Sequence, residues 1–489
     1  MSASSRNGRC ITGISGLDEV LAGGLPENRL YLLQGTPGVG KTTLALQFLL
    51  AGVERGEAGL YITLSETKDE IAAVAESHGW DLSKLEMLEL SAIEEVLAES
   101  KENTFFHPSE LELTKTTQIL LSHVEKTKPR RVVLDSLSEF RLLAENPLRY
   151  RRQMLRLKQF FAGRKSTVLL LDDQTGEGSD LHIQSISHGV ITLERLSMSY
   201  GIERRQLKVE KLRGVKFREG AHDYRINRGG LEVFPRLVAA EHKKEFVNEP
   251  ISSGIGGFDT LMGGGLDRGT SNLFIGPAGC GKSTLALQHA VAAARRGEKS
   301  MIFIFDENEY TLEKRARAVG LDLTEHLSAG TICIQQVDPA ELSPGEFVSV
   351  VRKKLEQDKV GLVIIDSLNG YLNSMPDEKS LNLQLHELLT YLSQQGAVSI
   401  MTLAQHGMIG SMQSPVDVTY LADAVVLLRY FEAQGKLNKA ISVIKKRSGH
   451  HETSIRELKI EEGKIIVGDP LEKFHGVMSG IPQLMGVRT

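Results

Sequence analysis

The chain has 489 residues, of which 41% are hydrophobic and 25% are charged, and its formal net charge at pH 7 is −4. This length is too great for one ordinary hydrophobic core and indicates about two to four domains. The composition is that of a soluble globular protein, and the weakly negative charge gives no general attraction to nucleic acid or to an anionic membrane.

Cysteine usage and apolar segments bear on cellular location. Cys10, Cys280 and Cys333 stand far apart, so they form neither a disulfide framework nor a CxxC metal site. The first residues, MSASSRNGRC, lack the apolar stretch of a signal peptide. No later segment has about 18 consecutive apolar residues, the length that a membrane helix needs. We therefore expect a cytoplasmic protein that does not span or bind a membrane.

In chain order, the first half alternates apolar strands with helices. RLYLLQG (29–35) predicts a short buried strand, and TTLALQFLLAGVERG (42–56) predicts the helix after it. Further strands are expected at 59–66, 130–136, 166–173, 189–195 and 204–214. Continuous Val, Ile and Leu runs indicate strands buried on both faces, so the pattern predicts an α/β fold with a mainly parallel twisted sheet flanked by helices.

The chain then repeats itself. Residues 12–47, from TGISGLDEVLAGGLP through GKTTLALQ, reappear at 253–288 as SGIGGFDTLMGGGLD through GKSTLALQ. A period this long indicates a duplicated domain rather than a small solenoid repeat. The polar segment 236–250 precedes the second copy, and we predict an N-terminal domain at 1–243 and a C-terminal domain at 244–489.

Each copy contains a glycine-rich phosphate loop of the form GxxxxGK[ST] between a strand and a helix. Glycines let backbone N–H groups turn toward phosphates, and the helix N-terminus adds a positive dipole. Lys41 and Lys282 are expected to reach the β- and γ-phosphates of ATP, and the Thr42 and Ser283 hydroxyls to hold Mg²⁺. The residues expected to bind ATP are Gly35, Thr36, Pro37, Gly38, Val39, Gly40, Lys41, Thr42 and Thr43, and Gly276, Pro277, Ala278, Gly279, Cys280, Gly281, Lys282, Ser283 and Thr284.

Acidic residues follow two further strands in each copy. VVLDS and LVIIDS end in Asp135 and Asp366, which are expected to hold Mg²⁺ through its water shell, as Walker B aspartates do. YITLSE and FIFDE end in Glu66 and in Asp306 and Glu307. Ligands of open α/β sheets bind at the carboxyl ends of strands, so these acids are predicted to orient an attacking water or hydroxyl.

With these motifs the chain resembles KaiC and KaiC-like proteins of the RecA/RadA ATPase superfamily over nearly its whole length. The matching segments are SGLDEVLAGGLP, SHGWDLSKL (77–85), LDSLSEF, KLRG and KKRSGHHETSIRE. The resemblance implies two tandem RecA-like P-loop NTPase domains, stacked as two tiers of a homohexameric double ring with ATP between subunits. It also implies a C-terminal tier that phosphorylates and dephosphorylates itself, and Kai-type regulatory proteins as partners.

The resemblance implies roles for two Lys-x-Arg pairs. Lys211 and Arg213, and Lys445 and Arg447, match residues that touch the γ-phosphate of the next subunit's ATP. Residues two apart on a strand project to one face, so each pair can present two cations together. Cations supplied in trans stabilise charge on the transferring phosphoryl group.

Three departures from the KaiC pattern are visible. A Glu-Glu pair at the catalytic strand end is replaced here by Ser65-Glu66 and by Asp306-Glu307. The phosphoacceptor Ser-Thr pair falls on Thr419-Tyr420, which leaves Thr419 and nearby Ser414 as candidate acceptors. The tail after Ile465 is short and contains no evident docking peptide for an activator.

Two rival functions remain open. A DNA-dependent ATPase of recombination or repair would use the basic helical face of RYRRQMLRLKQ (149–159), but the net charge is negative and the zinc-binding CxxC pairs of RadA are absent. A non-catalytic scaffold would use ATP only to assemble its ring. The favoured prediction is an ATPase with Ser/Thr autokinase activity in its second half, acting in clock-type or stress signalling, and DNA is not expected as a partner.

Overall fold

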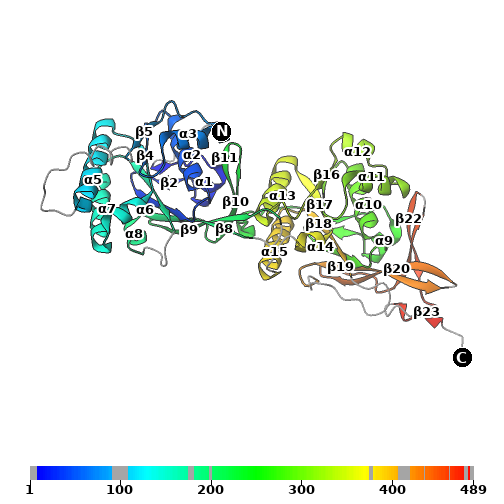
Figure 1. The fold of residues 1–489 in the computed structure, drawn as a ribbon. Helices are drawn as coiled ribbons and strands as arrows, with labels where there is room; N and C mark the ends of the chain where they lie inside the picture. The colour runs from blue at the N-terminus through cyan, green and yellow to red at the C-terminus, as the bar shows by residue number, and fades with distance from the viewer. Residues whose placement is uncertain are drawn as a thin grey trace. The chain divides into compact units, whose positions relative to one another are not determined.

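The computed structural model describes residues 8–90, 108–174, 181–197, 201–373, 378–405, 419–433, 435–461, 463–477 and 483–484. Contacts divide the chain into two compact units, Met1–Arg236 and Leu237–Thr489 (Figure 1). Leu237 and Ala239 are buried in a core cluster of the second unit, which explains why this unit begins within the predicted linker. The domain boundary predicted after residue 243 stays a prediction.

In its described residues the first unit contains a nine-stranded sheet with the order β11-β10-β9-β8-β3-β7-β6-β4-β5. Strands β8, β3, β7, β6, β4 and β5 are parallel, and β9, β10 and β11 extend the sheet antiparallel. The bounds are β3 (Leu30–Gly35), β4 (Gly59–Thr63), β5 (Glu86–Glu89), β6 (Arg131–Asp135), β7 (Thr167–Asp173), β8 (Gly189–Leu196), β9 (Arg204–Leu212), β10 (Ala221–Asn227) and β11 (Gly230–Phe234).

The second unit repeats this topology with the order β16-β15-β17-β18-β14-β19-β20-β21-β22 in its described part. Its strands are β14 (Ser271–Gly276), β15 (Lys299–Ile304), β16 (Ile332–Gln336), β17 (Val360–Asp366), β18 (Val398–Ala404), β19 (Ala424–Ala433), β20 (Lys436–Lys446), β21 (Arg456–Glu461) and β22 (Lys464–Pro470). Short strand pairs are β1 (Arg9–Cys10) with β2 (Leu25–Pro26), β12 (Pro250–Ile251) with β13 (Leu266–Asp267), and β23 (Phe474–His475) with β24 (Gln483–Leu484). The predicted mainly parallel α/β fold in two tandem copies is confirmed.

Helices cover both faces of each sheet. In the first unit they are α1 (Ser15–Val20), α2 (Lys41–Val53) and α3 (Lys68–His78) on one face, and α5 (Pro108–Thr127), α6 (Leu137–Ala144), α7 (Pro147–Ala162) and α8 (Leu181–Ile186) on the other. In the second they are α9 (Gly256–Leu261), α10 (Lys282–Arg295), α11 (Glu309–Ala318) and α12 (Thr324–Ser328), and opposite them α13 (Pro344–Asp358), α14 (Leu368–Asn373) and α15 (Glu378–Gln394), with the 3-10 turn η1 (Ala239–Glu241).

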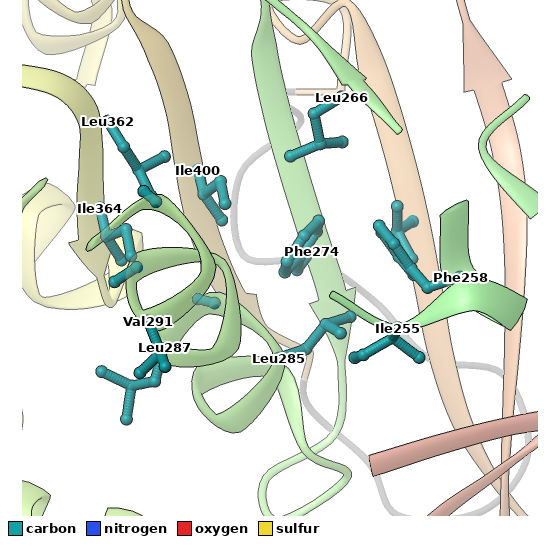
Figure 2. Packing of buried hydrophobic residues seen from close by; sticks show 14 of the residues in the cluster. Ile255, Phe258, Leu266, Phe274, Leu285, Leu287, Val291, Leu362, Ile364 and Ile400 are labelled. Carbon is teal, nitrogen blue, oxygen red and sulfur yellow. The ribbon is translucent and has the colours of Figure 1, made fainter. Parts of the chain in front are cut away.

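The apolar strands explain this layering. Successive side chains of a strand point to opposite faces, so Tyr31 and Leu33 pack with α2 while Leu30 and Leu32 pack with α7. The second unit is built in the same way. Phe274 of β14 and Ile400 of β18 belong to the same core cluster as Leu285 and Leu287 of α10 (Figure 2). A strand buried on both faces cannot tolerate alternating polar residues, which is why the sequence showed continuous apolar runs.

One predicted strand is shorter in the structure than its apolar run. The strand expected at 59–66 ends at Thr63. The Thr63 hydroxyl donates to the carbonyl oxygen of Glu66 at 2.7 Å and accepts from the backbone N–H of Glu66 at 3.0 Å. These bonds turn the chain away from the sheet, so Glu66 lies in a turn just beyond the carboxyl end of β4.

Candidate functional site

The first phosphate loop joins β3 to α2. Gly40, the residue before α2, has a φ of 99°, a left-handed conformation that glycine adopts without strain. The loop therefore turns sharply, and α2 begins at Lys41 with its N-terminus facing the loop. The Lys41 ammonium donates to the carbonyl oxygens of Gly35 at 2.9 Å and Thr36 at 3.1 Å. Lys41 thus folds back across the predicted phosphate cradle.

The second loop has the same geometry. Gly281 has a φ of 109° and precedes Lys282, the first residue of α10. The Lys282 ammonium donates to the carbonyl oxygens of Gly276 at 2.9 Å and Pro277 at 2.8 Å. Burial lowers the pKa of Lys282, which the nearby Cys280 and Asp366 partly oppose. A buried ammonium gains most from an anionic partner, so this position suits a phosphate.

The four predicted magnesium residues lie together in two pairs. The Thr42 hydroxyl donates to the Asp135 carboxylate at 3.2 Å, and the Ser283 hydroxyl donates to the Asp366 carboxylate at 3.0 Å. Mg²⁺ prefers one or two carboxylate or hydroxyl oxygens and completes its shell with water and substrate phosphates. Each pair fits that requirement, and no cluster of three or more acidic, His or Cys ligands occurs among the described residues.

The two aspartates are held by different neighbouring strands. Asp135 accepts a hydrogen bond from the Tyr61 hydroxyl of β4. Asp366 accepts one from the Thr402 hydroxyl of β18, on its other side. Burial and the adjacent Asp135 carboxylate raise the pKa of Tyr61 well above its usual range, so this phenol stays protonated and donates. Neither hydroxyl was predicted from the sequence, because both stand out only as polar residues inside apolar runs.

The predicted water-orienting acids also differ between the units. Burial, followed by the charges of Asp135, Glu70 and Asp173, raises the pKa of Glu66. Glu307 instead forms an ion pair with Arg315 of α11 at 2.5 Å. Asp306 accepts a hydrogen bond from the Ser367 hydroxyl, directly after Asp366.

A further acid lies at the first phosphate loop. Asp173, the last residue of β7, approaches the Lys41 ammonium to 2.6 Å. Its neighbour Asp172 pairs with Arg141 of α6 at 2.8 Å. Asp173 was not predicted from the sequence, although the apolar run STVLLLDD visibly ends in two acids.

Comparison with known proteins shows the family of the chain. The family model described as "ATPase: KaiC" matches residues 10–238 and again residues 251–472. The chain belongs to the KaiC ATPase family. It is 26% identical over 486 residues to the circadian clock oscillator protein KaiC of Picosynechococcus sp., covering 97% of this chain and 92% of that protein.

Two other relatives match over a similar share of both chains. The circadian clock oscillator protein KaiC of Synechococcus elongatus is 25% identical over 480 residues, covering 96% of this chain and 91% of that protein. The circadian clock protein KaiC3 of Synechocystis sp. is 25% identical over 479 residues, covering 96% and 94%. The chain is thus a KaiC-family ATPase with two tandem domains, and the matches span both.

The two Lys-x-Arg pairs of this KaiC-family chain lie at the sheet edge opposite the phosphate loops. Lys211 is paired in register with Val190, near the start of β8, whereas Gly35 at the end of β3 is paired with Leu193. The Lys211 ammonium donates to the carbonyl oxygen of Gln184, and the Arg213 guanidinium donates to that of Ser185 at 2.8 Å.

The second pair has the same kind of partners. The Lys445 ammonium donates to the carbonyl oxygens of Thr419 at 3.1 Å and Ala422 at 2.8 Å. The Arg447 guanidinium donates to the carbonyl oxygen of Tyr420 at 2.9 Å and lies 3.6 Å from the Asp423 carboxylate. Arg447 is 53% exposed, so it is accessible to a second copy of the chain.

In the first unit, the same edge carries a cationic cavity of about 220 Å³. It is lined by Asn28, Arg29, Leu30, Lys158, Phe161, Ala162, Ile186, His188 and Arg213. Burial, and then the Arg29 charge, lowers the pKa of His188. No acid is among these described lining residues, so the cavity favours an anion.

The remaining predicted residues are the candidate phosphoacceptors and the basic residues of segment 149–159. Thr419 lies in a turn before β19, and Ser414 lies outside the described residues. The basic residues of 149–159 belong to α7, where Arg149, Arg152 and Arg156 are exposed. Within the part of the chain that the structure describes, no helix has the length and apolar composition needed to cross a bilayer.

Proposed function

We propose that this protein binds ATP with Mg²⁺ in both units and hydrolyses it, and that its second unit transfers phosphate to a Ser or Thr of the chain itself. The observation that carries this proposal is the duplicated set of lysine, hydroxyl and carboxylate around each phosphate loop. The lysine, the hydroxyl and the carboxylate are intact in both units, which argues against a non-catalytic scaffold that uses ATP only to assemble its ring.

Each group has a distinct task. Backbone N–H groups of the loop and the helix N-terminus bind phosphate oxygens, and Lys41 or Lys282 binds the β- and γ-phosphates. Thr42 with Asp135, and Ser283 with Asp366, orient Mg²⁺ and its water ligands. A Mg²⁺ ion held by these residues would neutralise charge that develops on the transferring phosphoryl group. Glu66, or Glu307 beside Asp306, orients the attacking water or hydroxyl.

The position of the Lys-x-Arg pairs supports assembly into a ring. These cations lie at the amino edge of each sheet, away from the phosphate loop of their own unit. They can complete a site only when a second copy presents its loop to that edge. Together with the KaiC relatives, this supports a homohexameric double ring in which each subunit supplies Lys211 and Arg213, and Lys445 and Arg447, to its neighbour.

The same edge supports autophosphorylation. The Thr419 carbonyl oxygen binds the Lys445 ammonium, so this candidate acceptor lies beside the cations that are proposed to meet the neighbour's γ-phosphate. A reacting hydroxyl must approach within about 3–3.5 Å of phosphorus, and placement on this edge allows that approach across subunits. Ser414 is the second candidate acceptor, a cytoplasmic location is expected, and Kai-type regulatory proteins are the candidate partners.

The test combines two measurements on the full chain with ATP and Mg²⁺. Phosphate release shows hydrolysis, and an intact-mass increase of about 80 Da shows autophosphorylation. Mapping of the modified peptide then identifies the acceptor. Phosphate release without a mass change would remove the autokinase and leave the ATPase. The absence of both activities from an ATP-binding chain would favour the nucleotide-gated scaffold.

A DNA-dependent ATPase remains the second candidate, because Arg149, Arg152 and Arg156 of α7 are exposed. Phosphate contacts make binding strongly salt-dependent. A DNA-stimulated ATPase rate that falls steeply between about 50 and 200 mM salt would favour it. A rate that DNA does not change would reject it.

A further inference from the structure

The lysine of the first phosphate loop already has an internal carboxylate partner. Asp173 lies 2.6 Å from the Lys41 ammonium, with the two side chains 27% and 7% exposed. Asp173 is paired in register with Gly35, at the point where β3 enters the loop. The carboxylate is therefore at the mouth of the phosphate cradle and on the group that is proposed to bind the β- and γ-phosphates.

The second unit lacks this carboxylate. The residue paired in register with Gly276, the counterpart of Gly35, is Ala404. Within the described residues, no carboxylate lies within ion-pair distance of Lys282, whose ammonium, like that of Lys41, donates to loop carbonyl oxygens. Two loops with the same glycine and lysine pattern thus differ by one charge on the neighbouring strand, where Asp173 and Ala404 hold equivalent positions.

The carboxylate opposes phosphate binding in two ways. It occupies the ammonium that the phosphates would bind, and it repels the negative charge of the triphosphate. Other acids close to the loop add to this repulsion. The charges of Asp135 and Asp173 both raise the pKa of Glu66, so the three carboxyl groups lie near one another. The second oxygen of Asp173 lies 3.4 Å from the Ser138 hydroxyl of α6, which gives the carboxylate another donor when Lys41 turns to phosphate.

We propose that Asp173 sets the nucleotide affinity of the first unit, acting as a tethered competitor of the γ-phosphate for Lys41. The second unit then fills at lower ATP concentrations, and the first unit fills only when ATP is abundant. Asp173 is a positioning residue in this role, since it acts through Lys41. This inference rests on the proposed function, because it requires that the first loop binds ATP.

The decisive experiment measures ATP affinity at the first loop in the full chain. Lys282→Ala removes the second site. Titration calorimetry then compares the ATP affinity of this variant, which keeps Asp173, with that of the double variant that also carries Asp173→Asn. We expect Asp173→Asn to bind ATP at least about tenfold more tightly, because a competing negative charge is removed. Equal or weaker binding would overturn the inference while leaving the proposed function intact.

The second unit provides a matched reciprocal control. In a Lys41→Ala background, Ala404→Asp introduces the carboxylate beside Lys282, and Ala404→Asn introduces nearly the same volume without charge. We expect about tenfold weaker ATP binding for Ala404→Asp relative to Ala404→Asn. Equal binding by the two variants would contradict the competition. If neither the Asp173 chain nor its Asn variant binds ATP, the proposed function fails and this inference fails with it.

A thermal measurement separates competition from a purely structural ion pair. Without ATP, Asp173→Asn loses an ion pair, so Tm should not rise. With ATP, the increase in Tm should be larger than in the Asp173 chain, since tighter binding stabilises the folded state more. A structural role alone would lower Tm by the same amount with and without ATP, and that result would overturn the proposal.

Discussion

The two phosphate sites of this chain keep the same reactive groups and differ in the side chains that hold them. Both have a loop lysine, a hydroxyl and a strand-end aspartate in matching positions. Around them, Tyr61 holds Asp135 in the first unit and Thr402 holds Asp366 in the second. Glu307 has Arg315 as an ion-pair partner, whereas Val74 stands at the equivalent position in the first unit.

The groups that are proposed to bind phosphate and Mg²⁺ are therefore the same in both units, while the side chains that hold them come from different adjacent strands. The Asp135 carboxylate has β4 on one side, and Asp366 has β18 on the other, so a donor on either strand can fix the carboxylate. Each of these donors contacts the aspartate of one unit only, so paired substitutions can test how far the two units have diverged.

The largest expected effect comes from removing each loop lysine. Lys41→Ala and Lys282→Ala should each abolish nucleotide binding in one unit, because the phosphates lose a buried cation. Binding stoichiometry should fall from two ATP per chain to one in each variant, measured by equilibrium dialysis. A double variant that still binds two ATP would refute the assignment of both loops.

The next largest effect concerns the Lys-x-Arg pairs, which are proposed to contact the ATP of a neighbouring subunit. Arg447→Ala should slow second-unit turnover by about 1,000-fold, because an arginine that stabilises the transferring phosphoryl group is lost. ATP binding and Tm should change little, since Arg447 is exposed. Phosphate release in a Lys41→Ala background isolates the second unit. Lys459→Ala, another exposed cation at 51%, is the matched control and should be silent. An unchanged rate in Arg447→Ala would remove its catalytic role.

The fold and the phosphate loops were predictable because their signals are local. Apolar runs define strands buried on both faces, and the loop motif places Gly40, Lys41 and Thr42 within a few residues of one another. The end of β4 was less predictable, because it depends on the Thr63 hydroxyl bonding the backbone of Glu66. A side-chain hydrogen bond of this kind competes with the sheet and leaves the apolar pattern unchanged.

The supports of the site were not predictable from the sequence. Asp173 and Lys41 lie on different elements, and only the pairing of β3 with β7 brings them together. Tyr61 and Thr402 are single polar residues inside apolar strands, and the sequence does not show which neighbour they meet. Such contacts follow from sheet order and register, which set which strand ends are adjacent.

A smaller effect should follow from removing the hydroxyl supports. Tyr61→Phe and Thr402→Val keep side-chain shape and remove the donor to Asp135 and Asp366, respectively. Loss of a group that orients a metal ligand typically costs about 10- to 100-fold in metal affinity. The Mg²⁺ concentration that supports half-maximal turnover should rise by that factor in the affected unit alone, measured in the Lys282→Ala and Lys41→Ala backgrounds. An equal shift in both units would show that the supports are not separate.

The smallest expected effect is the change in Tm when the Glu66 carboxyl group is replaced by an amide. Burial and neighbouring acids raise its pKa in the folded state, so folding favours its protonated form. Its stability contribution is present in acid and is lost as pH rises through the raised pKa. Glu66→Gln should therefore increase Tm by about 1–3 °C at neutral pH, with the gain vanishing in acid, while slowing hydrolysis in the first unit.

Glu307→Gln gives the opposing case, because Glu307 has a cationic partner in Arg315 at 2.5 Å. Neutralising it removes an ion pair, so Tm should stay the same or fall. Calorimetric melting of both variants between about pH 5 and 8 compares the two units directly. A Tm increase in Glu307→Gln as large as that in Glu66→Gln would mean that the acids share one environment. The contrast drawn from Arg315 and Val74 would then be wrong.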